Sequence, residues 1–102
     1  MAISDSVNGD LSLDRRKRLC SILYSIYDGA ISYARVEGER IIPIENLNHF
    51  VNALINIDEE RLKKEKGIIG AKIFELSCNG GDASSLENYL EICEKIRTEL
   101  FN

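Results

Sequence analysis

The chain has 102 residues, of which 44% are hydrophobic and 29% charged, a balance typical of one folded domain and not of a disordered tail. Thirteen basic and 17 acidic side chains give a net charge of -4. This charge is too mild for a DNA mimic and has the wrong sign for a protein that binds phosphates through its overall charge. The length also leaves little room for separate binding and catalytic lobes.

The N-terminal residues are polar and turn-prone, so we expect a flexible arm over residues 1–11 and a single helical domain over residues 12–102. The start of the chain lacks the basic and apolar segments of a secretory signal, and no stretch is apolar enough to cross a membrane. Cys20, Cys78 and Cys93 are an odd number without CxxC spacing, which argues against a disulfide framework. The sequence therefore predicts a cytoplasmic protein without a membrane partner.

A helical period follows the arm. Two adjacent apolar stripes, spaced by three and four residues, predict a first helix over residues 13–36 that ends before Gly38. One stripe consists of Leu19, Leu23, Ile26, Ala30 and Tyr33, and the other of Cys20, Tyr24, Tyr27, Ile31 and Ala34. Two stripes are wider than one helix contact needs, so we expect this helix to contact more than one neighbour.

A short β-prone stretch, residues 39–42, is expected to be a connector. Pro43 suits the first position of a second helix, because its fixed φ is helical and its missing N–H is no loss there. Apolar residues at helical spacing then predict this helix over residues 43–56.

A third helix is predicted over residues 59–78, because Asp58 suits its N-cap and two glutamates follow in the first turn. Gly67 and Gly70 weaken its middle and indicate a kink or break.

Ser84 and Glu87 have the capping-box spacing and predict the start of a fourth helix over residues 84–101. The four helices together predict an all-α fold class, a compact four-helix bundle-like domain.

Residues suited to catalysis or metal binding are sparse. The three cysteines and His49 contain no closely spaced pair, so we expect no zinc site and no other cofactor. No serine lies in a nucleophile-elbow motif, no glycine-rich phosphate loop is present, and the paired carboxylates are explained by helix ends. We therefore expect no catalytic, cofactor-binding or metal-binding residues and no enzymatic activity.

Two sets of residues are candidates for a protein interface. One side of the predicted first helix carries small residues that would let another helix approach closely: Ser21, Ser25, Gly29 and Ser32. The second helix presents side chains that desolvate more cheaply than charges: Asn48, His49 and Asn52. The alternative for the small residues is close packing within the monomer, and the alternative for the residues of the second helix is chance composition.

Arg15, Arg16, Lys17 and Arg18 form a basic cluster near the start of the predicted first helix, where the helix dipole disfavours positive charge. A solvated, partly paired helix start is one interpretation of this cluster. Contact with an acidic protein or with nucleic acid is the other.

These patterns predict a non-enzymatic protein–protein interaction module, such as an inhibitor, an immunity-type protein or an adaptor. We expect it to form a homodimer through the first helix and to bind a protein partner of unknown identity. The alternative is a nucleic-acid-binding transcriptional regulator that uses residues 15–18 to contact phosphates.

Overall fold

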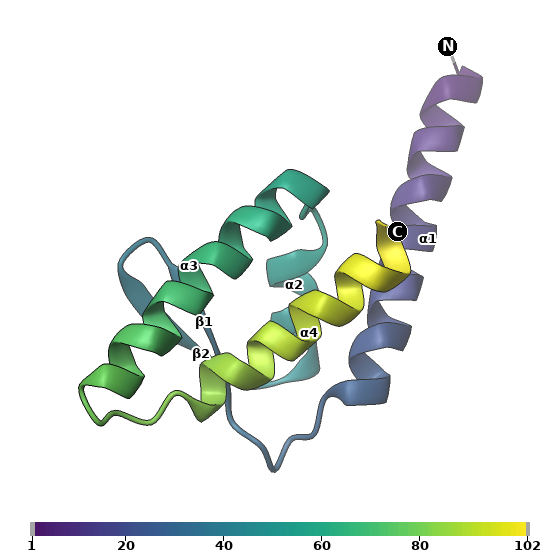
Figure 1. The fold of residues 1–102 in the computed structure, drawn as a ribbon. Helices are drawn as coiled ribbons and strands as arrows, with labels where there is room; N and C mark the ends of the chain where they lie inside the picture. Colours follow the sequence, from purple (N-terminus) through teal and green to yellow (C-terminus); the bar gives the residue numbers. More distant parts are fainter. Residues whose placement is uncertain (1, 102) are drawn as a thin grey trace.

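Four helices and one β-hairpin make up the part of the chain that the computed structural model describes, which is residues 2–101 for the backbone and 13–101 for the side chains. In chain order they are α1 (Ala2–Ile26), β1 (Tyr33–Glu37), β2 (Arg40–Ile44), α2 (Leu47–Leu54), α3 (Glu59–Cys78) and α4 (Ser84–Leu100) (Figure 1). The all-α prediction is therefore wrong, because a two-stranded antiparallel sheet lies between α1 and α2. The arm predicted over residues 1–11 has its side chains outside the described residues and stays a prediction.

The first helix ends at Ile26 and not at residue 36 as predicted. A turn follows, and Asp28 accepts two hydrogen bonds in it. Its side-chain carboxylate accepts one from the backbone N–H of Ala30 (2.9 Å), and its backbone carbonyl accepts one from the backbone N–H of Ile31 (2.9 Å). Aspartate and glycine favour such turns because they offer a local acceptor and a free backbone. Gly29 therefore lies exposed in a turn and not in the middle of a helix.

The hairpin is closed by a two-residue turn. Gly38 has a φ of +63°, whereas Glu39 keeps a negative φ, which is the pattern of a type II′ turn. The flanking residues are mostly β-branched or aromatic, as strands prefer. The connector predicted over residues 39–42 is thus half of a hairpin.

Pro43 lies in β2 opposite Ala34 of β1, so its predicted role at the start of a helix is wrong. A two-residue turn makes Glu37 and Arg40 a hydrogen-bonded pair, and such pairs then alternate along the ladder. Pro43 falls at a position whose backbone nitrogen faces away from β1. A proline is tolerated there because that nitrogen has no partner in the hairpin.

The second helix begins at Leu47, four residues later than predicted, because Asn46 provides its N-cap. The Asn46 side chain accepts a hydrogen bond from the backbone of His49 (2.9 Å). The helix ends at Leu54 instead of residue 56.

The third helix has the predicted bounds, and Asp58 caps it by accepting a hydrogen bond from the backbone of Arg61 (2.7 Å). The helix continues through Gly67 and Gly70, so the predicted break is wrong, whereas the predicted kink stays a prediction.

The fourth helix begins at Ser84 as predicted, but the capping box is not formed, since Ala83 occupies the N-cap. The carboxylate of Asp82 accepts hydrogen bonds from the Ser84 backbone (3.0 Å) and hydroxyl (2.6 Å) instead. These bonds lower the pKa of Asp82.

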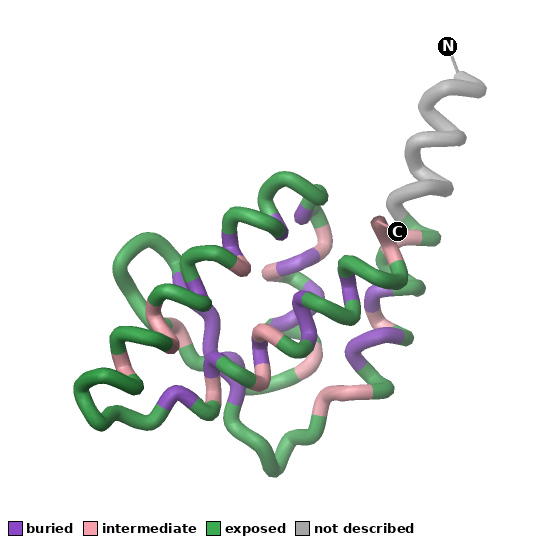
Figure 2. Tube along the Cα trace, in the orientation of Figure 1, coloured by how far each residue is buried: buried purple, intermediate pink, exposed green. Residues whose placement is uncertain are grey.

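The helices α3 and α4 run side by side in opposite directions, with the hairpin and α2 on their far side and α1 packed on α2 and α4 (Figure 1). Buried residues line the inner sides of these elements (Figure 2). An aromatic cluster lies at the centre, with ring centroids 5.2–6.1 Å apart: Tyr27, Tyr33, Phe50 and Tyr89.

Candidate functional site

A buried carboxylate connects the elements around the core. Glu65 of α3 accepts hydrogen bonds from the Tyr89 hydroxyl of α4 (2.9 Å) and from the Arg35 guanidinium of β1 (3.0 Å). The Arg35 and Glu65 side chains are 10% and 4% exposed. Arg35 also donates to the carbonyl of Ala53 near the end of α2 (3.2 Å). This network therefore fixes the hairpin relative to three helices.

The network is well suited to positioning and poorly suited to chemistry. Both carboxylate oxygens of Glu65 already accept a hydrogen bond, Oε1 from the Tyr89 hydroxyl and Oε2 from the Arg35 guanidinium. The guanidinium of Arg61 also approaches Oε2 from the surface (3.5 Å). Removal of one member of a buried ion pair costs about 3–5 kcal/mol, because the remaining charge is left uncompensated. The arrangement thus makes the fold specific rather than reactive.

Two other groups of the core are held in their protonated forms. Burial raises the pKa of the Tyr89 phenol far above its ordinary value, and it raises the pKa of the Cys93 thiol to about 12. The thiolate is the nucleophilic form of cysteine, so Cys93 is inert at neutral pH.

A hollow of about 370 Å³ lies on the surface above this network, between the hairpin, α2 and the first turn of α3. It is lined by Arg35, Glu37, Ile42, His49, Asn52, Ala53 and Arg61. Its two arginines are balanced by Glu37 and the underlying Glu65, so it has no excess charge with which to hold an anion. Of the predicted interface residues of α2, His49 and Asn52 line this hollow, while Asn48 is exposed elsewhere.

The predicted small-residue side of the first helix is divided in the structure. Ser21 and Ser25 lie exposed on α1, but Gly29 and Ser32 lie beyond its end. The four residues therefore do not form one helix face. Tyr24, on the same exposed part of α1, is 77% exposed.

Half of the basic cluster has a partner within the fold. Arg18 donates a hydrogen bond to the carbonyl of Glu99 (2.6 Å), and the Arg15 guanidinium lies over the Phe101 ring, 5.2 Å from its centroid. Both positions are at the C-terminal end of α4, where the helix dipole attracts cations. Arg16 and Lys17 are exposed. Arg15 and Arg18 thus stabilise this end of α4, and because α1 begins at Ala2 the basic cluster lies in the middle of α1, away from the helix end where the dipole disfavours positive charge.

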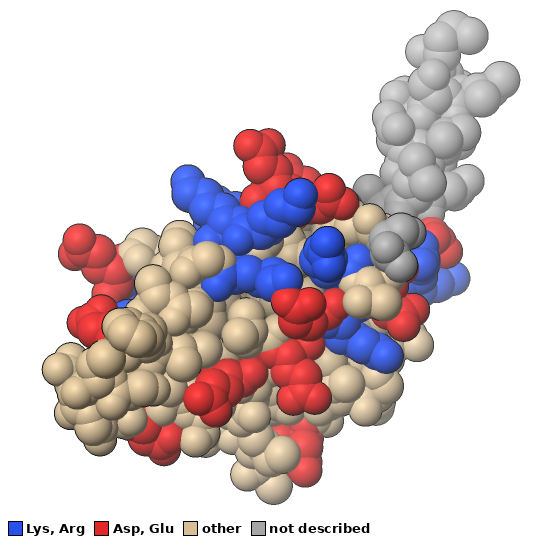
Figure 3. Space-filling view, viewed as in Figure 1, with Lys and Arg blue, Asp and Glu red and all other residues tan. Residues whose placement is uncertain are grey.

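The second half of α3 presents an uncharged outer face. Helical spacing aligns five exposed residues, which we call the α3 outer face: Gly67, Gly70, Ala71, Phe74 and Cys78. Phe74 is 71% exposed, and Ile68 at the border is 38% exposed. Figure 3 shows an uncharged area over this half of the helix, and basic and acidic side chains over the other half.

Packing within the molecule does not explain the two glycines of this face. A Cβ atom added at Gly67 or at Gly70 would meet no atom within 4 Å apart from its chain neighbours and the backbone of its own helix. Glycine destabilises a helix interior by about 0.8–1.0 kcal/mol relative to alanine. The fold therefore carries about 2 kcal/mol of avoidable destabilisation at this face.

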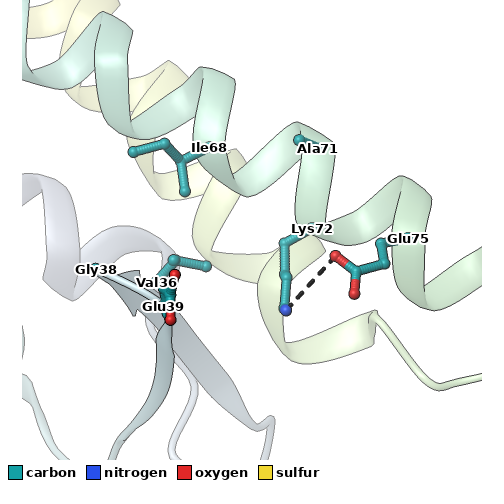
Figure 4. A pocket seen from close by; sticks show the side chains of 7 residues that line it. All are labelled: Val36, Gly38, Glu39, Ile68, Ala71, Lys72 and Glu75. Atoms are coloured by element: carbon teal, nitrogen blue, oxygen red, sulfur yellow. Dashed lines mark ion pairs between the residues drawn. The ribbon is translucent and has the colours of Figure 1, made fainter.

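A groove of about 520 Å³ adjoins the α3 outer face on the side of the hairpin. Figure 4 shows Ile68 and Lys72 pointing from α3 toward the hairpin, with Lys72 paired to Glu75 (3.6 Å). Val36, Gly38 and Glu39 form the opposite wall. Ile68 and Ala71 connect the groove to the outer face.

Sequence reasoning missed both the buried network and the α3 outer face. The partners of Glu65 are 30 and 24 residues away, so no local pattern marks it. The outer face did have a signal, because residues 67–81 include only two charged side chains, Lys72 and Glu75. Because the two glycines were interpreted as the site of a kink or break, the uncharged segment was not recognised as a helix face.

Comparisons with known proteins identify no relative, since no protein-family model, curated protein or solved structure matches the chain. Within the described residues, every helix is too short or too polar to cross a membrane. The same residues contain no group of three or more His, Cys, Asp or Glu side chains placed to hold a metal ion.

Proposed function

We propose that the protein is a non-enzymatic protein-interaction module that docks through the α3 outer face. Phe74 carries this proposal, because its ring is 71% exposed at the middle of a helix face without charged residues. Exposed aromatic residues surrounded by small apolar ones are typical of interface anchors. Burial of such a side chain contributes about 1.5–3 kcal/mol.

The exposed side of α1 is the weaker candidate for this role. Tyr24 is as exposed as Phe74, but its hydroxyl is solvated by water, and its neighbours include Ser21, Ser25 and Lys17. A polar helix face of this kind is stable in water without a partner. We therefore propose α3 in place of the predicted first helix.

The proposed mode of action is occlusion or scaffolding by a rigid helix, as for an inhibitor, an immunity-type protein or an adaptor. The network around Glu65 supports this mode because it fixes α3 to β1, α2 and α4. A cytoplasmic location is part of the proposal, and an exposed free thiol at Cys78 is compatible with a reducing compartment.

The nucleic-acid alternative has less support than the sequence suggested. Arg15 and Arg18 interact with the end of α4, so Arg16 and Lys17 are the members of the cluster free for phosphate contacts. Two contacts would give a shallow dependence of binding on salt concentration. A mobility shift of duplex DNA or RNA that weakens steeply with salt would favour this alternative.

Photo-crosslinking tests the interaction proposal without assuming the partner. A benzoylphenylalanine at position 74 should give covalent protein adducts in cells of the source organism, because its side chain lies inside the interface. The same group at position 24 is the matched control and should give none. Adducts from position 24 alone would assign the interface to α1, and a lack of adducts from both positions would refute the interaction module.

A further inference from the structure

We infer that Asn79 is a site of spontaneous covalent modification, at which the chain converts this asparagine to aspartate and isoaspartate and thereby opens the C-terminal cap of α3. Asn79 and Gly80 begin the turn that connects α3 to α4. The backbone of Gly80 is the attacking group, and water is the only other reactant. The reaction does not depend on the proposed function.

The residue after Asn79 is the one that hinders attack on the side-chain amide least. An asparagine loses its amide when the backbone nitrogen of the next residue reaches Cγ, and a glycine has no Cβ to obstruct this approach. The turn is open to water, because Asn79, Gly80, Gly81 and Asp82 are all exposed (Figure 2). Sequence and exposure together therefore make Asn79 a reactive site.

The turn must open before the reaction, and this opening is local. Asn79 has a φ of -94° and a ψ of 6°, and the Gly80 N–H donates to the Ser77 carbonyl (3.3 Å) and not toward the Asn79 side chain. This hydrogen bond is longer than an ordinary N–H···O bond. Residues 77–82 are all exposed, so their rearrangement brings no buried side chain into water. Such segments open at a small free-energy cost.

The chemistry has two steps. The Gly80 nitrogen loses its proton to a base in the solvent and bonds to Cγ of Asn79, while the bond from Cγ to Nδ2 breaks and ammonia leaves. Water then opens the cyclic imide at one of its two carbonyl carbons. One opening gives aspartate, and the other gives isoaspartate, in which the main chain runs through Cβ and Cγ. No oxidant or reductant is needed.

The modification disrupts the end of α3. Gly80, with a φ of +74°, and Gly81 donate the two hydrogen bonds of a Schellman cap, to Ser77 (3.3 Å) and Leu76 (2.7 Å). Isoaspartate inserts an additional main-chain atom before Gly80, so the two N–H groups no longer fit both carbonyls. Both products also place a carboxylate at the negative end of the helix dipole. The last turn of α3 is therefore expected to fray.

Peptide mass spectrometry of the aged full chain tests the modification. The purified chain is incubated in a mildly alkaline buffer and digested with trypsin, which releases Asn79 and Asn88 in one peptide, residues 73–95. Asn79 should show the mass change from amide to acid at least about tenfold faster than Asn88, because Tyr89 obstructs the second site. The Asn88 amide is also held by the Ser32 carbonyl (2.7 Å). Equal rates at the two asparagines would overturn the inference.

The same chain unfolded in urea is the positive control, because its Asn79 is released from the cap. Native Asn79 should react within about tenfold of the rate in urea, since opening of an exposed turn costs little free energy. Conversion in urea without conversion in the native chain would show that the cap protects Asn79 and would overturn the inference. Lack of conversion in both samples would also overturn it.

Thermal unfolding tests the effect on α3. Asn79→Asp carries the charge of the aspartate product and should lower Tm by about 2–8 °C. Asn56→Asp makes the same change of charge shortly before Asp58, the N-cap of α3, where the dipole favours a carboxylate, so it should not lower Tm. An unchanged Tm in Asn79→Asp, or an equal fall in both variants, would refute the disruption of the cap.

The isoaspartate form of the aged chain, separated by ion exchange, should unfold at a lower temperature than Asn79→Asp. The two chains carry the same charge, and only isoaspartate lengthens the main chain before Gly80. An equal or higher Tm of the isoaspartate form would refute the role of the Schellman hydrogen bonds.

Discussion

Replacement of Gly67 and Gly70 by alanine is expected to stabilise the fold and to weaken the association. A Cβ at either position meets no atom within 4 Å beyond its chain neighbours and its own helix backbone, so the change brings the gain in helix propensity without a clash. That gain is about 0.8–1.0 kcal/mol per site, or about 2 kcal/mol for the double variant. For a domain of this size the expected rise in Tm is about 10 °C. At an interface on the α3 outer face, the same methyl groups hold the partner away from the helix backbone.

Urea unfolding of the purified chain, followed by circular dichroism, measures the stability. Gly80→Ala is the matched control, because Gly80 has a φ of +74° and alanine is strained there. We expect this control to lower the free energy of unfolding by about 1 kcal/mol or more. Photo-crosslinking from position 74 in the same variants measures the association.

Two results would refute the reasoning. An unchanged or lower stability of the double alanine variant would mean that α3 is not a regular helix through its glycines. A higher stability with undiminished crosslinking would mean that the glycines do not serve a close contact with the partner.

Three further predictions concern the core and the end of α4. Glu65→Gln should lower the free energy of unfolding in urea by about 3–5 kcal/mol, since it leaves a buried guanidinium without its counter-charge, while Glu94→Gln in a surface pair should change it by less than about 1 kcal/mol. Equal losses of unfolding free energy in the two variants would contradict the larger contribution that we assign to the buried pair. Because burial raises the pKa of the Cys93 thiol from 9.0 to about 12, its contribution to stability is complete below pH 9 and is lost as the pH rises toward 12. Cys93→Ala should therefore flatten the fall in unfolding free energy above pH 9, and an unchanged slope would show that this thiol is not protected. Arg18→Ala should lower the stability by about 0.5 kcal/mol in thermal unfolding, because the Glu99 carbonyl loses a cationic donor; no change would mean that this contact contributes nothing.

The helices with local capping signals were the most predictable parts of the fold. The bounds of α3 follow from Asp58, whose side chain accepts from the helix backbone as the sequence indicated. The start of α4 was also predicted, although Asp82 and not the capping box prepares it. Such signals depend on residues a few positions apart, so they can be read without the tertiary structure.

The hairpin was missed because its residues extend the helical stripes of α1 by coincidence. Tyr33 and Ala34 fit the spacing of the two stripes, yet they follow a turn at Asp28 and pair with β2. The two-residue turn at Gly38 between two β-prone runs was the stronger signal. The segment forms a strand and not a helix because both faces of β1 are buried by neighbouring elements. That packing cannot be inferred from the local sequence.

The candidate site was less predictable than the fold. Glu65 resembles the other glutamates of the chain, and its burial depends on Arg35 and Tyr89 from distant elements. Phe74 lies off the helical spacing of the buried residues Leu62 and Ile69, and its exposure follows from the side of α3 that packs on α4. Of the residues chosen from the sequence, His49 and Asn52 do lie together at a hollow.

The position of Pro43 also limits how copies of this chain can aggregate. The outward-facing backbone of β2 would offer N–H groups at residues 41 and 43, and the proline removes the second. An incoming strand would find a single donor along that edge, too few for a stable ladder. The other strand, β1, is buried against α3 and α4. Growth of the sheet into cross-β fibrils is thus blocked in the native state.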